Sequence, residues 1–200
     1  MADDAATPLI VGISGASGAV LGVRALEACG ELGVPTHLIV SRTAALTLAE
    51  ETGLSLAEIG AKASKTHKAG DVGASIASGS FPTRGMIVAP CSVRTMSEIA
   101  TGVTSSLMSR AADVTLKEGR RLVLMVRETP LHLGHLRTLV QLAEMGAVIC
   151  PPMPAFYAGA ASVADLVDQS VGRALDQLGL TWSAVRRWGR DIGPIMGADE

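Results

Sequence analysis

Residues 8–21 read PLIVGISGASGAVL, an apolar run that closely spaced glycines interrupt before it resumes with helical spacing. The apolar run Leu9–Ile13 predicts a strand that is buried on both faces of a sheet. Gly12, Gly15 and Gly18 then allow the backbone to turn sharply and to approach a ligand closely. This strand–turn–helix pattern predicts the first unit of an α/β fold.

The turn after this strand should begin a helix whose first N–H groups are free to bind a ligand. Ser14 and Ser17 place hydroxyls beside those groups, so the loop can hold an anion, most naturally a phosphate. The spacing G-x-x-G-x-x-G differs from the G-x-G-x-x-G of dinucleotide-binding proteins, and no acidic residue follows at the ribose-binding distance. In a chain with 22 glycines, a tight turn without a ligand is an equal alternative.

Composition limits the class of protein. With 48% hydrophobic and 18% charged residues, the 200-residue chain is expected to form a single domain with flexible tails at 1–7 and 193–200. A net charge of -2 and scattered arginines argue against nucleic-acid binding. There is no apolar run of membrane-spanning length and no positively charged signal peptide. The 3 cysteines lack a CxxC pair and predict free thiols in a cytoplasmic protein.

Strand and helix patterns alternate along the chain. Such right-handed βαβ units predict a doubly wound parallel sheet in a three-layer α/β/α fold of flavodoxin-like or Rossmann-like class. Residues 55–82 do not fit the alternation, and we expect a long excursion over the ligand edge. The expected strands are Leu9–Ile13, Thr36–Val40, Gly85–Ala89, Leu122–Val126 and Ala147–Cys150. The expected helices are Ala19–Leu32, Thr43–Glu51, Thr95–Ala100, Ser105–Lys117, Leu131–Met145 and Val163–Leu178.

Polar residues follow the ends of the predicted strands. Ligands of open α/β sheets bind beyond the carboxyl ends of the strands, and converging hydroxyls, arginines and amides suit a phosphorylated ligand. A helix cap at Ser92, or an ion pair between Arg127 and Glu128, would explain single residues but not the shared location. These ends read Ser14-Gly15-Ala16-Ser17, Ser41-Arg42, Pro90 to Thr95, Arg127 to Pro130 and Pro151 to Tyr157.

The few aromatic residues are concentrated late in the chain. Phe156 and Tyr157 follow the last predicted strand, where they can stack on a flat conjugated cofactor such as flavin. For Trp182, packing of the C-terminal segment on the sheet edge is an equal alternative. The mean hydropathy of +0.37 further predicts that other copies of the chain cover some apolar surface.

Longer motifs occur along most of the chain: GISGASGAVLGVR (12–24), SGSF (78–81), PCSVRTMSEIATG (90–102), RAADVTLKE (110–118), VRETPLHLGHLR (126–137), GAVICPPMPAFY (146–157) and RRWG (186–189). Between residues 9 and 189 they resemble those of the UbiX-type flavin prenyltransferases, historically described as aromatic acid decarboxylase subunits. The resemblance implies a flavodoxin-like fold, bound FMN and a homododecamer with active sites between subunits. It implies transfer of a dimethylallyl group from dimethylallyl monophosphate to reduced FMN, with the prenylated FMN serving a UbiD-type decarboxylase.

The resemblance also implies roles for individual residues. FMN contacts are expected at Gly15, Ala16, Ser17, Ser41, Ser92, Val93, Arg94, Thr95 and Arg127. Contacts to the prenyl phosphate are expected at Arg110, Lys117, Arg127, Tyr157 and Arg173, with Trp188 lining the prenyl pocket. Catalytic roles are implied for Ser17 and Glu51 in proton transfer, for Glu128 near the leaving phosphate, and for Lys117 and Tyr157. The chain has no DDxxD motif, so we expect no metal and direct cationic contacts to the phosphate.

The sequence departs from the family pattern at Arg42, in place of lysine, and at Gly119-Arg120-Arg121, in place of Arg-Arg-Pro. A third departure, residues 158–161 (AGAA) in place of His-x-Pro, lies beside the expected phosphate site and leaves the ordering of that loop and the preferred prenyl donor open. Two alternative functions also remain. An FMN-dependent cysteine decarboxylase shares the fold, but PCSVRT departs from its PASANT-type turn, and no histidine has a catalytic context. A non-catalytic FMN-binding partner of an aromatic acid decarboxylase would not need residues such as Glu51 and Lys117.

Overall fold

The structure is a computed structural model that describes residues 7–193. Apart from Thr7 and Gly193, the predicted flexible tails lie outside the described residues. Six parallel strands form one sheet in the order β3-β2-β1-β4-β5-β6. At the centre, Leu9 of β1 pairs with Thr36 of β2 and with Gly85 of β4. The strands are β1 (Leu9–Ile13), β2 (Thr36–Val40), β3 (Lys65–His67), β4 (Gly85–Cys91), β5 (Arg121–Val126) and β6 (Val148–Ile149).

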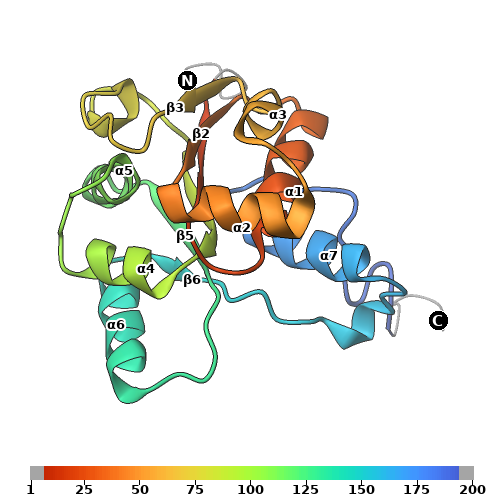
Figure 1. Ribbon diagram of the computed structural model, residues 1–200. Helices are drawn as coiled ribbons and strands as arrows, with labels where there is room; N and C mark the ends of the chain where they lie inside the picture. The colour runs from red at the N-terminus through yellow and green to blue at the C-terminus, as the bar shows by residue number, and fades with distance from the viewer. Residues whose placement is uncertain (1–6, 194–200) are drawn as a thin grey trace.

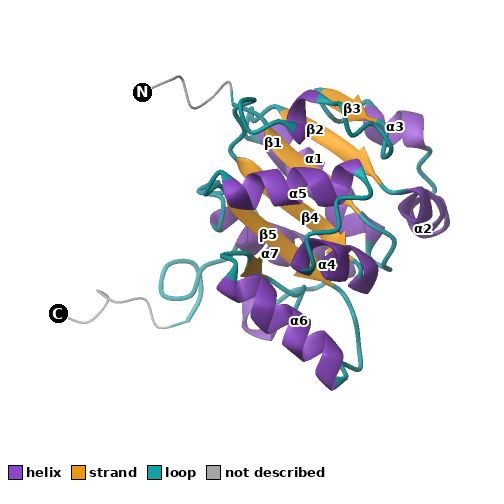
Figure 2. Cartoon of the chain, turned by 90° about the vertical axis from the view of Figure 1, so that its left-hand side faces the viewer, coloured by secondary structure: helices purple, strands orange, loops and turns teal. Residues whose placement is uncertain are grey.

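Helices cover both faces of the sheet, which confirms the predicted three-layer fold (Figures 1 and 2). Side chains alternate along a strand, so Val11 and Ile13 of β1 enter one core while Ile10 enters the other. On the first face lie α1 (Ala19–Glu31), α2 (Arg42–Thr52), α3 (Leu56–Gly60) and α7 (Val163–Asp176). On the second lie α4 (Val93–Ala100), α5 (Leu107–Lys117), α6 (Leu133–Glu144) and the short 3-10 helix η2 (Ser75–Ala77). A second 3-10 helix, η3 (Phe156–Ala158), follows β6 and lies near α7 (Figure 1).

The prediction for residues 55–82 was wrong in part. Instead of a simple excursion, the segment contains α3, η2 and the edge strand β3, whose Thr66 pairs with Leu38 of β2. A three-residue strand with two exposed positions carries too little periodicity to be recognised in the sequence. Only Ala69 and Gly70 of this segment reach the ligand edge. With β3 included, the strand order is that of the Rossmann fold; the other five strands alone follow the flavodoxin order.

A pair of histidines ties β3 to β2. His67 Nε2 lies 3.2 Å from His37 Nδ1, and the His37 ring stacks on Phe81 with 5.4 Å between the ring centroids. Burial, assisted by the neighbouring His67 and Lys65, lowers the pKa of His37 to about 4. Burial and Lys65 also lower the pKa of His67, against the opposing charge of Asp71. Both imidazoles are therefore neutral in the folded protein at neutral pH.

This pair predicts acid-sensitive stability. Unfolded histidines bind protons near pH 6.5, whereas folded His37 does so near 4, so the free energy of unfolding should fall as pH drops through that window. His37→Gln should flatten the slope between pH 7 and 5, above the range where most carboxyls titrate, in urea unfolding. His132→Asn is the matched control, because His132 is exposed and Asn preserves its N-cap of α6. A His37→Gln variant with the wild-type slope would contradict the prediction.

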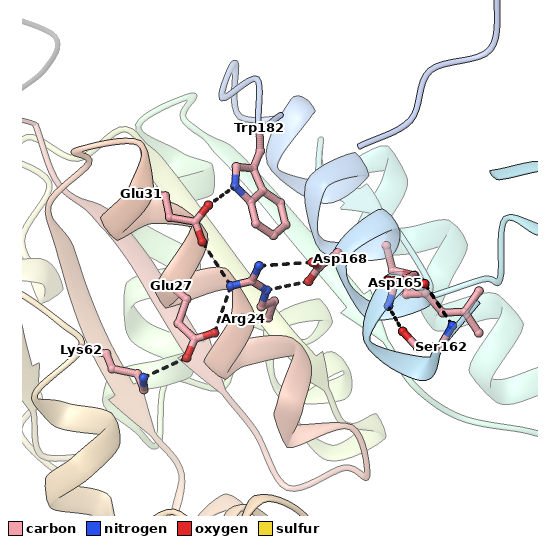
Figure 3. A network of polar contacts seen from close by, with 10 residues as sticks. Arg24, Glu27, Glu31, Lys62, Ser162, Asp165, Asp168 and Trp182 are labelled. Carbon is pink, nitrogen blue, oxygen red and sulfur yellow. Dashed lines mark hydrogen bonds and ion pairs between the residues drawn. The ribbon is translucent and has the colours of Figure 1, made fainter. Parts of the chain in front are cut away.

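Arg24 of α1 connects several elements on the first face (Figure 3). Its Nε donates to Asp168 Oδ1 of α7 at 2.6 Å, and its Nη1 lies 3.2 Å from both Glu27 and Glu31. The guanidinium lies 4.7 Å from the centre of the Trp182 ring, and Trp182 Nε1 donates to Glu31 at 2.7 Å. Trp182 is buried, so it packs the C-terminal segment on the first face, as the structural alternative for this residue held.

Arg24→Met is expected to lower the free energy of unfolding by about 2 kcal/mol, because the partly buried carboxylates of Glu27 and Asp168 would each lose a cationic partner. Urea unfolding at pH 7 measures the difference. The matched control is Arg190→Met: within residues 7–193, the Arg190 side chain forms an ion pair only with the adjacent Asp191, at 3.7 Å, and it is 74% exposed. The control should change stability by less than about 0.5 kcal/mol. Equal effects of the two substitutions would show that the Arg24 cluster adds nothing beyond a surface ion pair.

Candidate functional site

A cavity of about 800 Å³ opens at the carboxyl ends of β1, β2, β4 and β5. It includes the point between β1 and β4 where the strand order reverses, which is where open α/β sheets bind ligands. The helices α1, α2 and α4 all begin at this edge, so the N–H groups of their first turns face the same region. All nine predicted FMN contacts line it: Gly15, Ala16, Ser17, Ser41, Ser92, Val93, Arg94, Thr95 and Arg127.

Two glycines make the loop after β1 possible. A Cβ added to Gly15 would clash with the side chain of Thr43, whose own Cβ would lie only 2.6 Å away. Gly18 precedes α1 with φ at +101°, a conformation that other residues rarely adopt. The loop therefore lies flush against α2 and presents its backbone to the cavity.

Ser14 does not serve as the anion-binding group that the sequence suggested. Its hydroxyl donates to the Pro90 carbonyl at 2.8 Å and accepts from the Ser92 N–H at 2.7 Å. The residue is fully buried, so its hydroxyl is used in tying the ends of β1 and β4 together. Ser17, in contrast, is exposed and lines the cavity.

Two serines cap the helices that begin at the cavity. Ser41 Oγ accepts from the Ala44 N–H at 3.1 Å, which caps α2. Ser92 Oγ accepts from the Thr95 N–H at 3.3 Å and donates to Thr95 Oγ1 at 3.2 Å. The cap expected as an alternative at Ser92 is thus present, and Ser92 also lines the cavity.

Glu51 of α2 reaches across to the start of α1. Its Oε2 accepts from the N–H groups of Gly18 and Ala19, each at 2.8 Å. Burial acts to raise the pKa of Glu51, but hydrogen bonds from Ser17, Ala19 and Gly18 and the charge of Arg127 together hold it below its usual value. The group is therefore a carboxylate at neutral pH, next to the Ser17 hydroxyl.

Of the two arginines that were expected to contact FMN, Arg94 forms an ion pair within the described residues and Arg127 does not. The ion pair between Arg127 and Glu128, which was the alternative to a ligand role, does not form: Glu128 Oε1 instead accepts from the Thr129 N–H at 2.9 Å. Among the ion pairs found within residues 7–193, none involves the Arg127 guanidinium, which is exposed at the cavity. Arg94 pairs with Glu98 at 2.9 Å. Arg127 is thus left to bind an anionic ligand.

The residues present fit a phosphorylated ligand with a flat apolar part. The N-termini of α2 and α4, the hydroxyls of Ser17 and Ser41 and the cations Arg42 and Arg127 suit a phosphate group. The apolar side chains that line the same cavity suit a ring system: Leu46, Val93 and Met108. This donor set is what an FMN site requires.

The groups predicted for the prenyl phosphate lie outside this cavity, apart from Arg127. Lys117 ends α5, eleven residues long and about 15 Å from its first residue, and pairs with Glu118. Arg110 donates to Asp113 at 2.8 Å and to the Ala77 carbonyl at 3.2 Å. A single protomer therefore does not bring these two cations to the FMN contacts.

A second set of residues predicted to bind the prenyl donor lies near α7: Tyr157, Arg173 and Trp188. After β6 the chain leaves the sheet and runs to η3 near α7 (Figure 1). There the Tyr157 ring meets the Trp188 ring edge-on, with 5.6 Å between the centroids. Arg173 pairs with Asp176 at 2.6 Å. The roles assigned to Tyr157, Arg173 and Trp188 stay predictions, because neither the cavity nor their contacts within one protomer test them.

Several cavity residues were not predicted as site residues. Thr43 and Leu46 lie three positions apart on α2 and so share a helix face, but neither shares a face with Ser41, so helical spacing from Ser41 would not have indicated them. Ala69 and Gly70 belong to the loop after β3, the strand that the sequence did not reveal. The others are Arg42, Glu98, Ser105, Ser106 and Met108.

Two kinds of feature are absent from the described residues: a helix that could span a membrane and a cluster of metal-binding side chains. Between residues 7 and 193, no helix is long and apolar enough to span a membrane. In the same range, His, Cys, Asp and Glu side chains form no group of three or more that could hold a metal ion.

Comparison with known proteins identifies the family. The model of the flavoprotein family matches residues 2–175. The flavin prenyltransferase UbiX of Escherichia coli K12 is 56% identical over 174 residues, which cover 86% of this chain and 92% of the relative. A crystal structure of a UbiX protein with FMN and dimethylallyl pyrophosphate superposes with a TM-score of 0.90 at 46% identity, covering 92% of this chain and 97% of that one. A dodecameric FMN-dependent UbiX-like decarboxylase from Escherichia coli O157:H7 gives 0.89 at 48% identity, covering 91% and 99%. The chain therefore belongs to the UbiX flavin prenyltransferases, within the flavoprotein family.

Proposed function

We propose that the protein transfers a dimethylallyl group from dimethylallyl monophosphate to reduced FMN and so produces prenylated FMN. The observation that carries this function is the gathering of all nine expected FMN contacts around one cavity, with the Glu51 carboxylate beside it. FMN, when bound, supplies the ring that accepts the prenyl group. Membership of the family favours this reaction over a cysteine decarboxylase or a non-catalytic flavin carrier.

The side chains at the cavity have separate tasks. The Glu51 carboxylate is held by the N–H groups of Gly18 and Ala19, so it can accept a proton through the Ser17 hydroxyl. The Arg127 guanidinium balances charge on a departing phosphate. The apolar cavity residues Leu46, Val93 and Met108 exclude water from the allylic group.

Neighbouring copies of the chain complete the site in a homododecamer. This arrangement is supported by the position of Lys117, Arg110, Tyr157 and Arg173 outside the cavity of their own protomer. The dodecameric relative from Escherichia coli O157:H7 supports it too. The protein also exposes large apolar side chains on the segment that carries Tyr157, a surface that soluble monomers rarely leave uncovered. The most exposed are Met153 (72%), Phe156 (84%) and Val163 (76%).

Two wider expectations remain part of this proposal. The product serves a UbiD-type decarboxylase, since prenylated FMN has to leave this site before it can be used elsewhere. The setting is cytoplasmic, which the free thiols of Cys29, Cys91 and Cys150 support.

The function is tested by anaerobic incubation of the protein with reduced FMN and dimethylallyl monophosphate, followed by mass analysis of the released flavin. A mass gain of one prenyl unit is the expected result, and it should persist in EDTA because direct cationic contacts hold the phosphate. A parallel incubation with the pyrophosphate shows which donor the chain prefers. No mass gain with either donor would refute the function, and loss of product with EDTA would refute metal independence.

A further inference from the structure

Thr43, to which neither the sequence motifs nor the comparisons give a role, lies at the contact between two parts of the cavity. It is the second residue of α2, and it lines the cavity together with Ser41 and Gly15. Its side chain occupies the space that a Cβ on Gly15 would need. The loop after β1 therefore rests directly on Thr43.

The Thr43 hydroxyl also forms a pair with that of Ser41, with 3.2 Å between the two oxygens. Either oxygen can be the donor in this pair. Ser41 Oγ already accepts from the Ala44 N–H, and neither hydroxyl donates to any other residue among 7–193. Two hydroxyls that share one hydrogen bond leave one O–H group unused. In both orientations, this remaining O–H belongs to a residue that lines the cavity.

The acceptor best suited to this remaining O–H is a phosphate oxygen. The pair lies against the loop after β1 and at the N-terminus of α2, whose dipole and first N–H groups favour an anion. Arg42, between the two hydroxyl residues in sequence, adds a positive charge at the same place.

We propose that Thr43 is a positioning residue for the phosphate end of FMN. Its methyl-bearing side chain supports the Gly15 loop, and its hydroxyl shares one proton with Ser41 so that the other proton is donated to the phosphate. The inference rests on the proposed function, because it takes FMN as the ligand of the cavity.

The test compares Thr43→Val with Thr43→Ser, using FMN and riboflavin as probes in fluorescence titrations. Valine keeps the shape of threonine but lacks the hydroxyl, so FMN should bind roughly tenfold more weakly while riboflavin, which has no phosphate, should bind as to the wild type. Serine keeps the hydroxyl and should restore FMN binding to within about twofold. If valine impairs folding, Thr43→Ala is the second variant without the hydroxyl: it should weaken FMN binding clearly more than riboflavin binding, because the lost support of the Gly15 loop affects both flavins and the lost hydroxyl affects FMN alone.

The outcomes separate this inference from the proposed function. Unchanged FMN binding in Thr43→Val, or an equal loss of FMN and riboflavin, would overturn the role of Thr43 and leave the FMN site intact. A wild-type protein that binds neither flavin would overturn the proposed function and this inference with it.

Discussion

Glu51→Gln is expected to keep FMN binding and to slow formation of prenylated FMN by roughly a hundred- to ten-thousandfold, the range for loss of a general base. The glutamine carbonyl oxygen can still accept from the Gly18 and Ala19 N–H groups, so the start of α1 stays capped. An amide cannot take up the proton that the carboxylate accepts through Ser17. The measurement is a single-turnover anaerobic assay with mass analysis, next to an FMN titration.

Glu50→Gln is the matched control, because Glu50 is the preceding residue of α2 and is exposed. It removes the same charge from the same helix and should leave both FMN binding and turnover within about twofold, as expected for a surface substitution. If Glu51→Gln turned over at the wild-type rate, Glu51 would be only a helix cap. If it lost FMN as well, the carboxylate would be needed to shape the loop and its role in proton transfer would not be separable from that.

The strands that the sequence predicted with correct bounds are those formed by an uninterrupted, mostly apolar run. The bounds of β1 and β2 were predicted correctly, because both runs are buried and end at polar residues. β4 continues two residues further than expected, to Cys91, which pairs with Val126 after a shift of register. We expected the strand to stop before Pro90, because proline has no backbone N–H to donate to a neighbouring strand. The pairing of Cys91 with Val126 depends on the folded sheet and is not visible in the sequence.

At the site, too, roles set by neighbouring residues could be predicted, whereas roles set by residues distant in the sequence could not. Ser41 and Ser92 were predicted from their places at strand ends, since a residue that caps a helix lies next to the strand before it. Ser14 was assigned the wrong role because its partner, Pro90, is 76 residues away and only folding brings the two together. Lys117 lies at the far end of α5, outside the cavity of its own protomer, so its expected role requires that it reach the cavity of a neighbouring copy.

Mixed assemblies of two inactive variants should recover activity, because Glu51 and Lys117 would act in the same site from different copies. In Glu51→Gln the proton acceptor is lost, and in Lys117→Ala a cation for the leaving phosphate is lost, at roughly thirtyfold in kcat/KM or more. In a random 1:1 assembly, half of the cavities keep Glu51, and half of these face a copy that keeps Lys117. About a quarter of the wild-type rate should therefore return in a symmetric homo-oligomer whose sites lie between subunits.

The two variants are coexpressed with different affinity tags, and oligomers that carry both tags are assayed anaerobically with reduced FMN and dimethylallyl monophosphate. The matched control mixes Glu51→Gln with Ser17→Ala, whose altered residues meet in the cavity of a single protomer. Every cavity in that mixture carries one of the two defects, so no activity should return. Recovery in both mixtures would mean that Glu51 and Ser17 do not have to act from the same protomer, and recovery in neither would place Lys117 outside the site. Recovery only when Lys117 is supplied by another copy would explain why this α/β domain exposes the apolar segment around Phe156, since its active site would form only on assembly.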